Sequence, residues 1–358
     1  MFRKISLIAL LHCFIVGIIP QTLYAAEESF RWKMVTTWPP NFPILQEGAQ
    51  KLAKDIEEMS DGRLKIQVFA DNELIPAMQI FDAVSQGTTV QMGHGSAYYW
   101  AGKVPAAQFM SSVPFGMTAK GMNAWLLSGD GLKLWRELYT PFNLVPFPAG
   151  NTSIQMGGWF NKKIESVDDL KGLKMRMPGL GGKVLAKAGG TPVLMAGGEI
   201  YTALERGTID ATEWIGPFHD KRLGLDRAAK YYYYPGWHEP GTTLELIVNH
   251  KAWETLPKDL QRIIEIAAEA ANQWIYSQLE FHNSEALNEI KKKQNIEILA
   301  FPPAVLKELK RLTQETLQEE ADKNEDFKRV YESYQRFQSN MEAWHAISED
   351  AYTKALRD

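Results

Sequence analysis

The chain has 358 residues, one cysteine and a formal net charge of −4. This length suggests two lobes rather than one, and the acidic balance argues against a nucleic-acid partner, which would need a basic face. The only cysteine is Cys13, near the N-terminus, so the rest of the chain can form no disulfide and use no thiol chemistry. The fold must therefore depend on its hydrophobic core.

The first residues have the order of a secretory signal peptide. Arg3 and Lys4 give a positive start, an apolar run covers residues 5–20, and the small residue Ala25 follows. The apolar run is shorter than the ~20 residues that a membrane-spanning helix needs. We predict a signal peptide over residues 1–25 and a soluble periplasmic protein, whose net charge changes from −4 to −6 with the loss of Arg3 and Lys4.

From residue 30 to about residue 250, short β-rich runs alternate with helical patterns. Strand character is found at 30–38, 63–70 and 90–95, and helical spacing of apolar residues at 43–60 and 75–86. This order favours an α/β fold with parallel or mixed sheets covered by helices. We expect residues 26–150 to form the main part of lobe I.

The rhythm restarts after residue 150. The strand candidates are 154–160, 174–177, 192–195, 211–215 and 231–234, and the helical segments are 166–170, 180–188 and 199–206. We expect residues 151–240 to form lobe II. An alternating run at 243–249 is predicted to return to the first sheet, so that residues 241–275 complete lobe I and about 276–305 complete lobe II.

A long helix and a helical tail follow Pro257. Residues 259–294 contain no Pro or Gly and are rich in helix formers. At ~1.5 Å per residue this helix is long enough to cross both lobes. A strand is expected at 295–300, and a charged C-terminal extension at 306–358 is predicted to be helical. Its aromatic residues predict packing against another surface, such as that of a second subunit: Phe327, Tyr331, Tyr334, Phe337, Trp344 and Tyr352.

The common enzyme motifs are missing from the sequence. None of the histidine pairs has HExxH spacing, and no GxSxG nucleophile elbow is present. The glycine-rich segment 179–183 has the wrong glycine spacing for a P-loop, and Val184 follows its lysine instead of Ser or Thr. The sequence therefore gives no support for zinc-hydrolase, P-loop or serine-hydrolase chemistry.

Arg176 is the strongest candidate for a ligand-binding residue. It ends a predicted strand and precedes a Pro-Gly turn. The carboxyl ends of strands border the crevice in which α/β folds bind ligands, and a guanidinium group can hold a carboxylate with two parallel hydrogen bonds. The alternative is a surface salt bridge, which is the commoner role for any single arginine.

Further polar and aromatic residues lie at expected strand ends and lobe edges. Gln155, Glu213 and Glu239 carry oxygen donors that could gather a hard cation. No fixed spacing connects them, so an ordinary surface or hinge role stays open. Some of the aromatic residues could wall a dry pocket, which would strengthen an arginine–carboxylate attraction. The aromatic residues are Tyr98, Tyr99, Trp100, Trp159, Trp214, Phe218 and Trp237.

Two ordered stretches resemble the substrate-binding subunits of tripartite ATP-independent periplasmic (TRAP) transporters of the DctP type. They are 168–176 (DDLKGLKMR) and 203–211 (ALERGTIDA). The resemblance covers nearly all of the mature chain and supports Arg176 as a carboxylate clamp. It implies a solute receptor that serves TRAP membrane subunits, and not an enzyme.

Other segments resemble the α-keto-acid-binding branch of that family: 38–43, 93–99, 155–160 and the pair Glu213-Trp214. This branch implies a two-lobed periplasmic binding protein fold with lobes joined by strands and a long helix. It also implies a small organic acid held between the lobes together with Ca²⁺ or Na⁺, and a homodimer built through the C-terminal helices.

The same resemblance assigns roles to individual residues. The implied cation ligands are the side chains of Gln155, Glu213 and Glu239 and the backbone oxygen of Trp214. The implied substrate contacts are Arg176, Tyr98, Tyr99, Asn151, Gln155 and Trp214.

The expected ligand is a small 2-oxo or 2-hydroxy monocarboxylate of the pyruvate and lactate class. Such an acid offers a carboxylate oxygen and the neighbouring oxygen to a cation while Arg176 holds the carboxylate. Glu213, Glu239 and the ligand would bring about three negative charges near the ion, which modestly favours Ca²⁺ over Na⁺.

Two other hypotheses stay open at this point. A metal-dependent lyase acting on small keto acids would need a general base, and His94 is the only histidine that we expect near the implied pocket. A receptor that feeds a sensor instead of a transporter would have the same binding residues.

Overall fold

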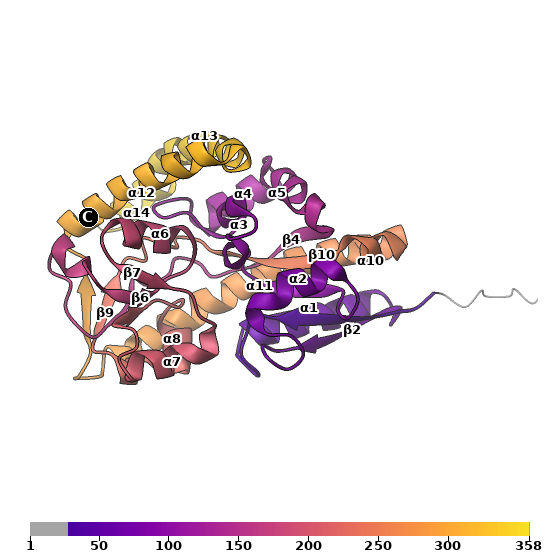
Figure 1. Ribbon diagram of the computed structural model, residues 1–358, viewed down its shortest axis with the longest axis horizontal. Coiled ribbons are helices and arrows are strands. Elements are labelled where there is room, and N and C mark those ends of the chain that lie inside the picture. The colour runs from indigo at the N-terminus through magenta and orange to yellow at the C-terminus, as the bar shows by residue number, and fades with distance from the viewer. Residues whose placement is uncertain (1–27, 358) are drawn as a thin grey trace, which may run out of the picture.

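The computed structural model describes residues 28–357 of the chain. The predicted signal peptide over residues 1–25 lies outside the described residues. The described part of the chain contains no helix with both the length and the apolar character needed to cross a membrane. Two mixed sheets, each covered by helices, form the predicted two-lobed α/β fold (Figure 1).

The first sheet has the strand order β2-β1-β3-β10-β4. Its strands are β1 (Phe30–Thr36), β2 (Leu64–Phe69), β3 (Met92–Gly95), β4 (Leu144–Asn151) and β10 (Thr243–Asn249). The first three are parallel, whereas β10 is antiparallel to both β3 and β4. Strand β10 therefore returns to the first sheet as predicted, and all of its residues are buried because helices cover both faces.

Helices pack on the two faces of this sheet. One face is covered by α1 (Leu45–Met59) and the first half of the long helix α11 (Lys258–Ile290). The other face carries α2 (Ile80–Gln86) and a group of short helices. This group comprises α3 (Gln108–Ser111), α4 (Ala119–Leu127), α5 (Gly131–Tyr139) and the 3-10 turns η1 (Ala77–Gln79), η2 (Ala97–Trp100), η3 (Pro105–Ala107) and η4 (Thr140–Phe142).

The second sheet has the order β11-β9-β5-β8-β6-β7. Its strands are β5 (Gly158–Phe160), β6 (Lys174–Arg176), β7 (Thr191–Val193), β8 (Ala211–Thr212), β9 (Tyr231–Tyr234) and β11 (Glu297–Ala300). Its covering elements are the turn η5 (Val167–Leu170) and the helices α6 (Gly179–Lys187), α7 (Gly197–Glu205), α8 (Pro217–Leu223) and α9 (Leu225–Ala228).

Besides the C-terminal extension described below, three segments connect the lobes. Residues 152–157 run from β4 to β5, residues 235–242 run from β9 to β10, and α11 runs from the first lobe to the second. We call 152–157 and 235–242 the two crossing segments. The long lobe-spanning helix is confirmed by α11, which follows the short helix α10 (His250–Thr255). The lobe boundaries near residues 150 and 240 stay a prediction.

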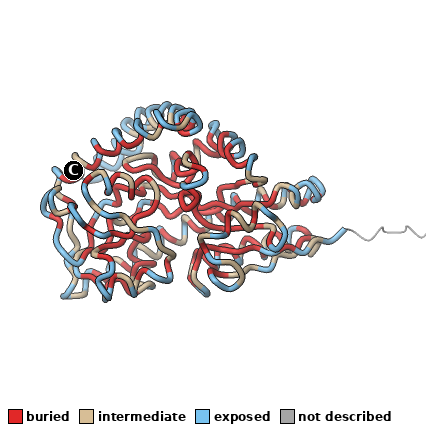
Figure 2. The backbone as a smooth tube through the Cα atoms, viewed as in Figure 1, coloured by how far each residue is buried: buried red, intermediate tan, exposed pale blue. Residues whose placement is uncertain are grey.

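The C-terminal extension folds back over both lobes, along the upper edge of Figure 1. Helix α12 (Pro303–Lys323) packs against the second lobe and α13 (Glu325–Ile347) against the first, before the short helix α14 (Glu349–Ala355). Phe327 and Tyr334 are buried in the core of the first lobe, so the inner part of the aromatic tail packs on its own chain. Figure 2 shows that the outer surface of this extension is exposed.

The observed strands differ from those expected from the sequence: one strand was not expected, and others have different lengths. Strand β4 contains Pro146 and Pro148, which cannot donate a backbone hydrogen bond, and it was not predicted. Both prolines are tolerated because β4 lies at the edge of its sheet. The strand expected at 154–160 is only Gly158–Phe160, because the chain before it turns through Ser153, whose φ is 62°. Helices α4 and α5 were also not predicted.

Glu245 on β10 is a buried carboxylate that connects the first sheet to the short helices above it. The indole Nε1 of Trp100 donates to one of its oxygens, and the Tyr139 hydroxyl donates to the other at 2.9 Å. Burial raises the pKa of Glu245 from its ordinary value of 4.5 to about 7.

We predict that Glu245→Gln removes a pH-dependent loss of stability. Because the pKa is raised in the folded state, the contribution of the protonated carboxyl is fully present below pH 4.5 and is lost as the pH rises through about 7. This loss is on the order of 3 kcal/mol in the native protein. Urea unfolding at a series of pH values measures it.

The exposed Glu254→Gln is the matched control, since its carboxylate is 65% exposed. It should keep the pH dependence of the native protein. Equal slopes of stability against pH for the native chain and Glu245→Gln would contradict the prediction.

Candidate functional site

The site lies where the two lobes meet, and strand register brings its first two residues together. Strands β6 and β8 are parallel, and Arg176 pairs in register with Thr212. Arg176 is the last residue of β6, and Glu213 directly follows the last residue of β8. The two residues therefore lie side by side at the same edge of the sheet. This is the carboxyl edge at which α/β folds bind ligands, so the predicted position of Arg176 in a crevice follows from the sheet itself.

Arg176 and Glu213 form a buried ion pair. Nη1 of Arg176 donates to Oε1 of Glu213, and the two side chains are 1% and 0% exposed. The guanidinium also lies 5.1 Å from the ring centre of Trp214 and donates from Nη2 to the Tyr99 hydroxyl at 3.3 Å. A surface salt bridge is thus excluded. Burial alone would lower the pKa of Arg176, but the Glu213 charge raises it instead.

Gln155 and Glu239 connect the two crossing segments. The amide Nε2 of Gln155 donates to Oε2 of Glu239 at 2.8 Å, and its backbone N–H donates to the Glu239 carbonyl at 3.2 Å. The Thr242 hydroxyl donates to the same carboxylate oxygen. Burial, and then the nearby Glu213 charge, raises the pKa of Glu239 to about 8.

Two buried oxygens in this group lack a partner. Within residues 28–357, no hydrogen bond reaches Oε1 of Gln155 or Oε2 of Glu213. Buried polar atoms are normally satisfied, so such orphans indicate a missing group. An amide oxygen and carboxylate oxygens are the ligands that hard cations such as Ca²⁺ prefer. The residues present therefore fit a cation of this kind.

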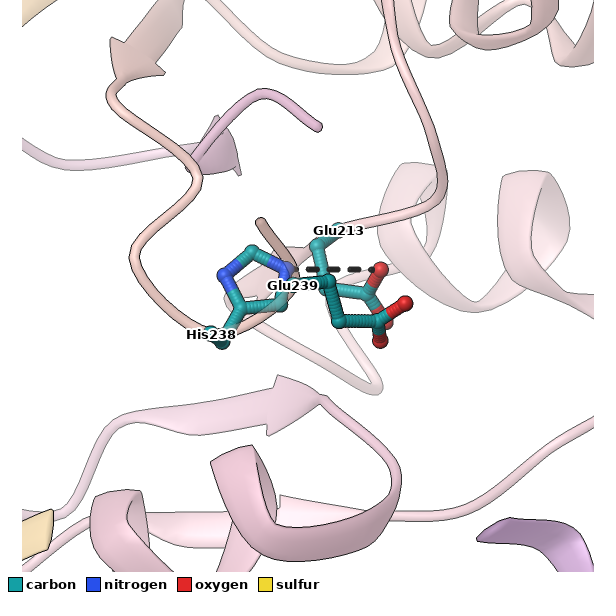
Figure 3. A group of neighbouring side chains, drawn as sticks. All are labelled: Glu213, His238 and Glu239. Atoms are coloured by element: carbon teal, nitrogen blue, oxygen red, sulfur yellow. Dashed lines mark ion pairs between the residues drawn. The ribbon is translucent and has the colours of Figure 1, made fainter. Parts of the chain in front are cut away.

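His238 belongs to the same group, and the sequence analysis did not single it out. Figure 3 shows its ring beside the carboxylates of Glu213 and Glu239. One donor atom from each of the three residues lies within 4.8 Å of the others, and all three residues are buried. In the sequence, only the position of His238 next to Glu239 could have indicated a role in the site, since no metal-binding spacing includes this histidine.

The expectation that His94 is the only histidine near the pocket is wrong. His238 occupies that place, whereas both ring nitrogens of His94 serve the core of the first lobe. Nδ1 accepts from the Trp38 indole at 2.8 Å, and Nε2 lies 3.1 Å from the Ala149 carbonyl. Burial lowers the pKa of His94 to about 4.

Tyr98 and Asn151 lie close to this group. A Cβ added to Gly179 at the start of α6 would lie 3.1 Å from the Tyr98 Cβ, so Tyr98 of the first lobe touches the second lobe and the cleft is closed. Asn151 donates to the Gly241 carbonyl at 3.3 Å and accepts from the Ser153 amide at 2.8 Å. Its side chain holds the crossing segments together in this state.

Two aromatic residues expected near a pocket lie elsewhere. Trp159 stacks on Tyr232 with ring centres 4.0 Å apart and is buried in the second lobe. Phe218 stacks on His282 and lines a surface hollow of about 500 Å³ between α8 and α11. The lining of this hollow contains none of the predicted site residues, so it is not the site described above.

Comparison with known proteins places the chain among solute-binding proteins. Residues 34–324 match the family described as bacterial extracellular solute-binding protein, family 7. A monocarboxylate 2-oxoacid-binding periplasmic protein of Nostoc sp. is 44% identical over 331 residues, which is 92% of this chain and 90% of the relative.

Three solved structures of TRAP periplasmic solute-binding proteins have the same fold. That from Pseudoalteromonas atlantica, with sodium and pyruvate, is 43% identical, with a TM-score of 0.89 and coverage of 91% of this chain and 99% of the other. The structure from Colwellia psychrerythraea, with calcium and pyruvate, is 44% identical, with a TM-score of 0.89 and coverage of 92% of this chain and 100% of the other. The structure from Bordetella bronchiseptica is a mixed-occupancy dimer with calcium and picolinate in one site. It is 38% identical, with a TM-score of 0.90 and coverage of 92% of this chain and 97% of the other.

We predict that Glu213→Gln destabilises the ligand-free protein by about 3–5 kcal/mol, because it leaves the Arg176 charge buried without its counter-charge. Chemical denaturation in ligand-free buffer measures the change. The control is Glu58→Gln, whose carboxylate is 65% exposed and which should change the stability by less than about 0.5 kcal/mol. A loss below about 1 kcal/mol for Glu213→Gln would show that the pair does not neutralise Arg176.

Proposed function

Because this chain belongs to family 7 of the bacterial extracellular solute-binding proteins, we propose that it captures a small 2-oxo or 2-hydroxy monocarboxylate between its lobes. The chain is a solute receptor of the TRAP class and not an enzyme, so the lyase hypothesis is set aside. The observation that carries the ligand proposal is the buried Arg176, whose charge is paired with the buried Glu213 in the closed cleft.

Arg176 is suited to exchange one carboxylate for another. A monocarboxylate entering the cleft meets a guanidinium that is held in place by the Trp214 ring and the Tyr99 hydroxyl. Its carboxylate can replace Glu213 as the partner of Arg176, since a guanidinium holds carboxylates through paired hydrogen bonds. We propose Tyr98, Tyr99, Asn151, Gln155 and Trp214 as the surrounding contacts.

The exchange leaves an excess of negative charge in a dry site. With Glu239 deprotonated to bind an ion, Glu213, Glu239 and the ligand bring three carboxylates against the single charge of Arg176, and burying unmatched charge is strongly unfavourable. A bound Ca²⁺ or Na⁺ supplies the missing positive charge and coordinates oxygen atoms. We propose the side chains of Gln155, Glu213 and Glu239, with the backbone oxygen of Trp214, as its ligands. Ca²⁺ balances the charges better than Na⁺.

The compartment and the membrane partner are also part of the proposal. The Nostoc relative is a periplasmic protein and the similar solved structures are TRAP receptors. The N-terminal pattern of residues 1–25 agrees with export. We propose that the protein works in the periplasm and delivers its ligand to the membrane subunits of a TRAP transporter.

Titration calorimetry with pyruvate tests the binding proposal. We expect one binding event in the presence of Ca²⁺ and a much weaker one after chelation, because the site then keeps its excess negative charge. Arg176→Ala should weaken binding by roughly 30-fold or more, the cost of removing one partner of a buried charge pair. Equal affinity with and without chelator would contradict the cation, and unchanged binding by Arg176→Ala would contradict the clamp.

The control variant is Arg262→Ala. Arg262 is 64% exposed and paired with Glu265 on the outer side of α11, so its loss should leave pyruvate affinity unchanged. If neither the native chain nor this control binds pyruvate or lactate in Ca²⁺, the ligand class is wrong.

A homodimer through the C-terminal helices is the last element of the proposal. The end of α13 and α14 expose a row of large apolar residues: Trp344 (60% exposed), Ile347 (76%), Tyr352 (67%) and Leu356 (69%). Apolar surface of this kind marks association sites, and the Bordetella receptor is a dimer.

We predict that light scattering after size exclusion gives a dimer mass, and that Trp344→Asp combined with Ile347→Asp gives a monomer, because the charges oppose burial of the apolar row. Met59→Asp is the control, since Met59 is 46% exposed at the end of α1, whereas α14 is paired through Glu349 with Lys120 of α4 on the opposite face of the first sheet. A dimer that survives the double substitution would place the contact elsewhere.

A further inference from the structure

His238 lies in the site without a hydrogen-bond partner on either ring nitrogen. Its exposure is 1%, and among residues 28–357 no hydrogen bond reaches Nδ1 or Nε2, although Nε2 lies at ion-pair distance from Glu213. Nε2 lies 3.6 Å from Oε2 of Glu213, which also lacks a hydrogen bond. Two facing buried atoms that both lack a partner indicate that a third group belongs between them.

The separation of these atoms suits a metal ion. In a tetrahedral site with bonds of about 2.0–2.1 Å, neighbouring ligand atoms lie roughly 3.3–3.4 Å apart. The 3.6 Å between His238 and Glu213 is close to that edge length. Glu239 brings a third donor within 4.8 Å of the other two (Figure 3).

The surroundings hold the three side chains in place. Oε2 of Glu239 accepts from Gln155 at 2.8 Å, and Glu213 accepts from Arg176 on its other oxygen. The His238 ring packs edge-on against Trp237 with ring centres 5.6 Å apart. Neighbours that orient the ligands in this way raise the affinity of a metal site.

An imidazole nitrogen changes which ions the group prefers. Sets made only of oxygen suit Na⁺, Mg²⁺ and Ca²⁺, whereas imidazole with carboxylates suits Zn²⁺ and other first-row transition ions. We propose that Glu213, His238 and Glu239 bind a divalent transition ion of the Zn²⁺ class in the ligand-free protein.

This ion competes with the cation of the organic-acid site. Both sets need Glu213 and Glu239, so the two ions exclude each other, and for this competition alone the inference rests on the proposed function. His238 distinguishes the two states, because the nitrogen-containing set requires its ring and the oxygen set does not. The availability of a transition ion then regulates how much receptor is ready for Ca²⁺ and its organic acid.

Calorimetry with ZnCl₂ on metal-free, full-length mature protein tests the inference. The starting variant carries Gln at the accessible histidines His250, His282 and His345, which removes surface zinc sites. We expect one Zn²⁺ per chain, and weaker apparent binding when Ca²⁺ is added. In this background His238→Gln should lower the Zn²⁺ affinity at least about tenfold.

An unchanged Zn²⁺ affinity in His238→Gln, or Zn²⁺ binding no tighter than Ca²⁺ binding in its parent, would overturn the inference. Loss of Ca²⁺-dependent pyruvate binding from both parent and variant would count against the proposed function instead. If His238→Gln does not fold, Co²⁺ added to the parent decides the question. Intense visible bands of four-coordinate Co²⁺ support the site, and the pale spectrum of six-coordinate Co²⁺ overturns it.

Discussion

A buried arginine requires a buried negative charge, and the arrangement of the site follows from that requirement. Arg176 and Glu213 meet because β6 and β8 are parallel and in register, so their last residues leave the sheet at one edge. The Trp214 ring and the Tyr99 hydroxyl also contact the guanidinium, whose buried Nε has no hydrogen-bond partner among residues 28–357. In this state the protein supplies internally the carboxylate that, in our proposal, a ligand supplies when it binds.

Three further polar residues of the site lie on the crossing segments, which couples recognition to the arrangement of the lobes. Gln155 lies on the first crossing segment, and His238 and Glu239 lie on the second. Two hydrogen bonds between Gln155 and Glu239 hold the segments together. The affinity of an ion or acid that binds these residues therefore depends on the geometry of the crossing segments. A ligand with different affinities for two arrangements of the lobes shifts the equilibrium between them.

The sequence was informative wherever a local pattern matched the local physics. The long apolar-periodic run without Pro or Gly predicted α11, and alternation predicted the return of β10 to the first sheet. Prediction from the sequence failed where the secondary structure depends on the position of a segment in the tertiary fold. The prolines of β4 are compatible with a strand only at a sheet edge, and no pattern in 144–151 reveals an edge.

The site residues divide in the same way. The position of Arg176 at a strand end made it a candidate for a crevice, with a surface salt bridge as the alternative. Its pairing with Glu213 depends on the register between β6 and β8, whose paired residues are 36 apart in sequence, and no local pattern encodes this register. His238 was missed, and His94 was placed near the site instead, because proximity to Glu213 arises from a crossing segment that returns from the other sheet.

The C-terminal extension has a consequence for how solutes enter. Helix α12 is fixed to the second lobe and α13 to the first, and between them stands Asn324, whose side chain caps α13 by accepting from the Phe327 amide at 2.8 Å. Separation of the lobes therefore has to displace this extension as well as α11 and the two crossing segments. A solute can reach Arg176 only through an opening that all these connections between the lobes allow.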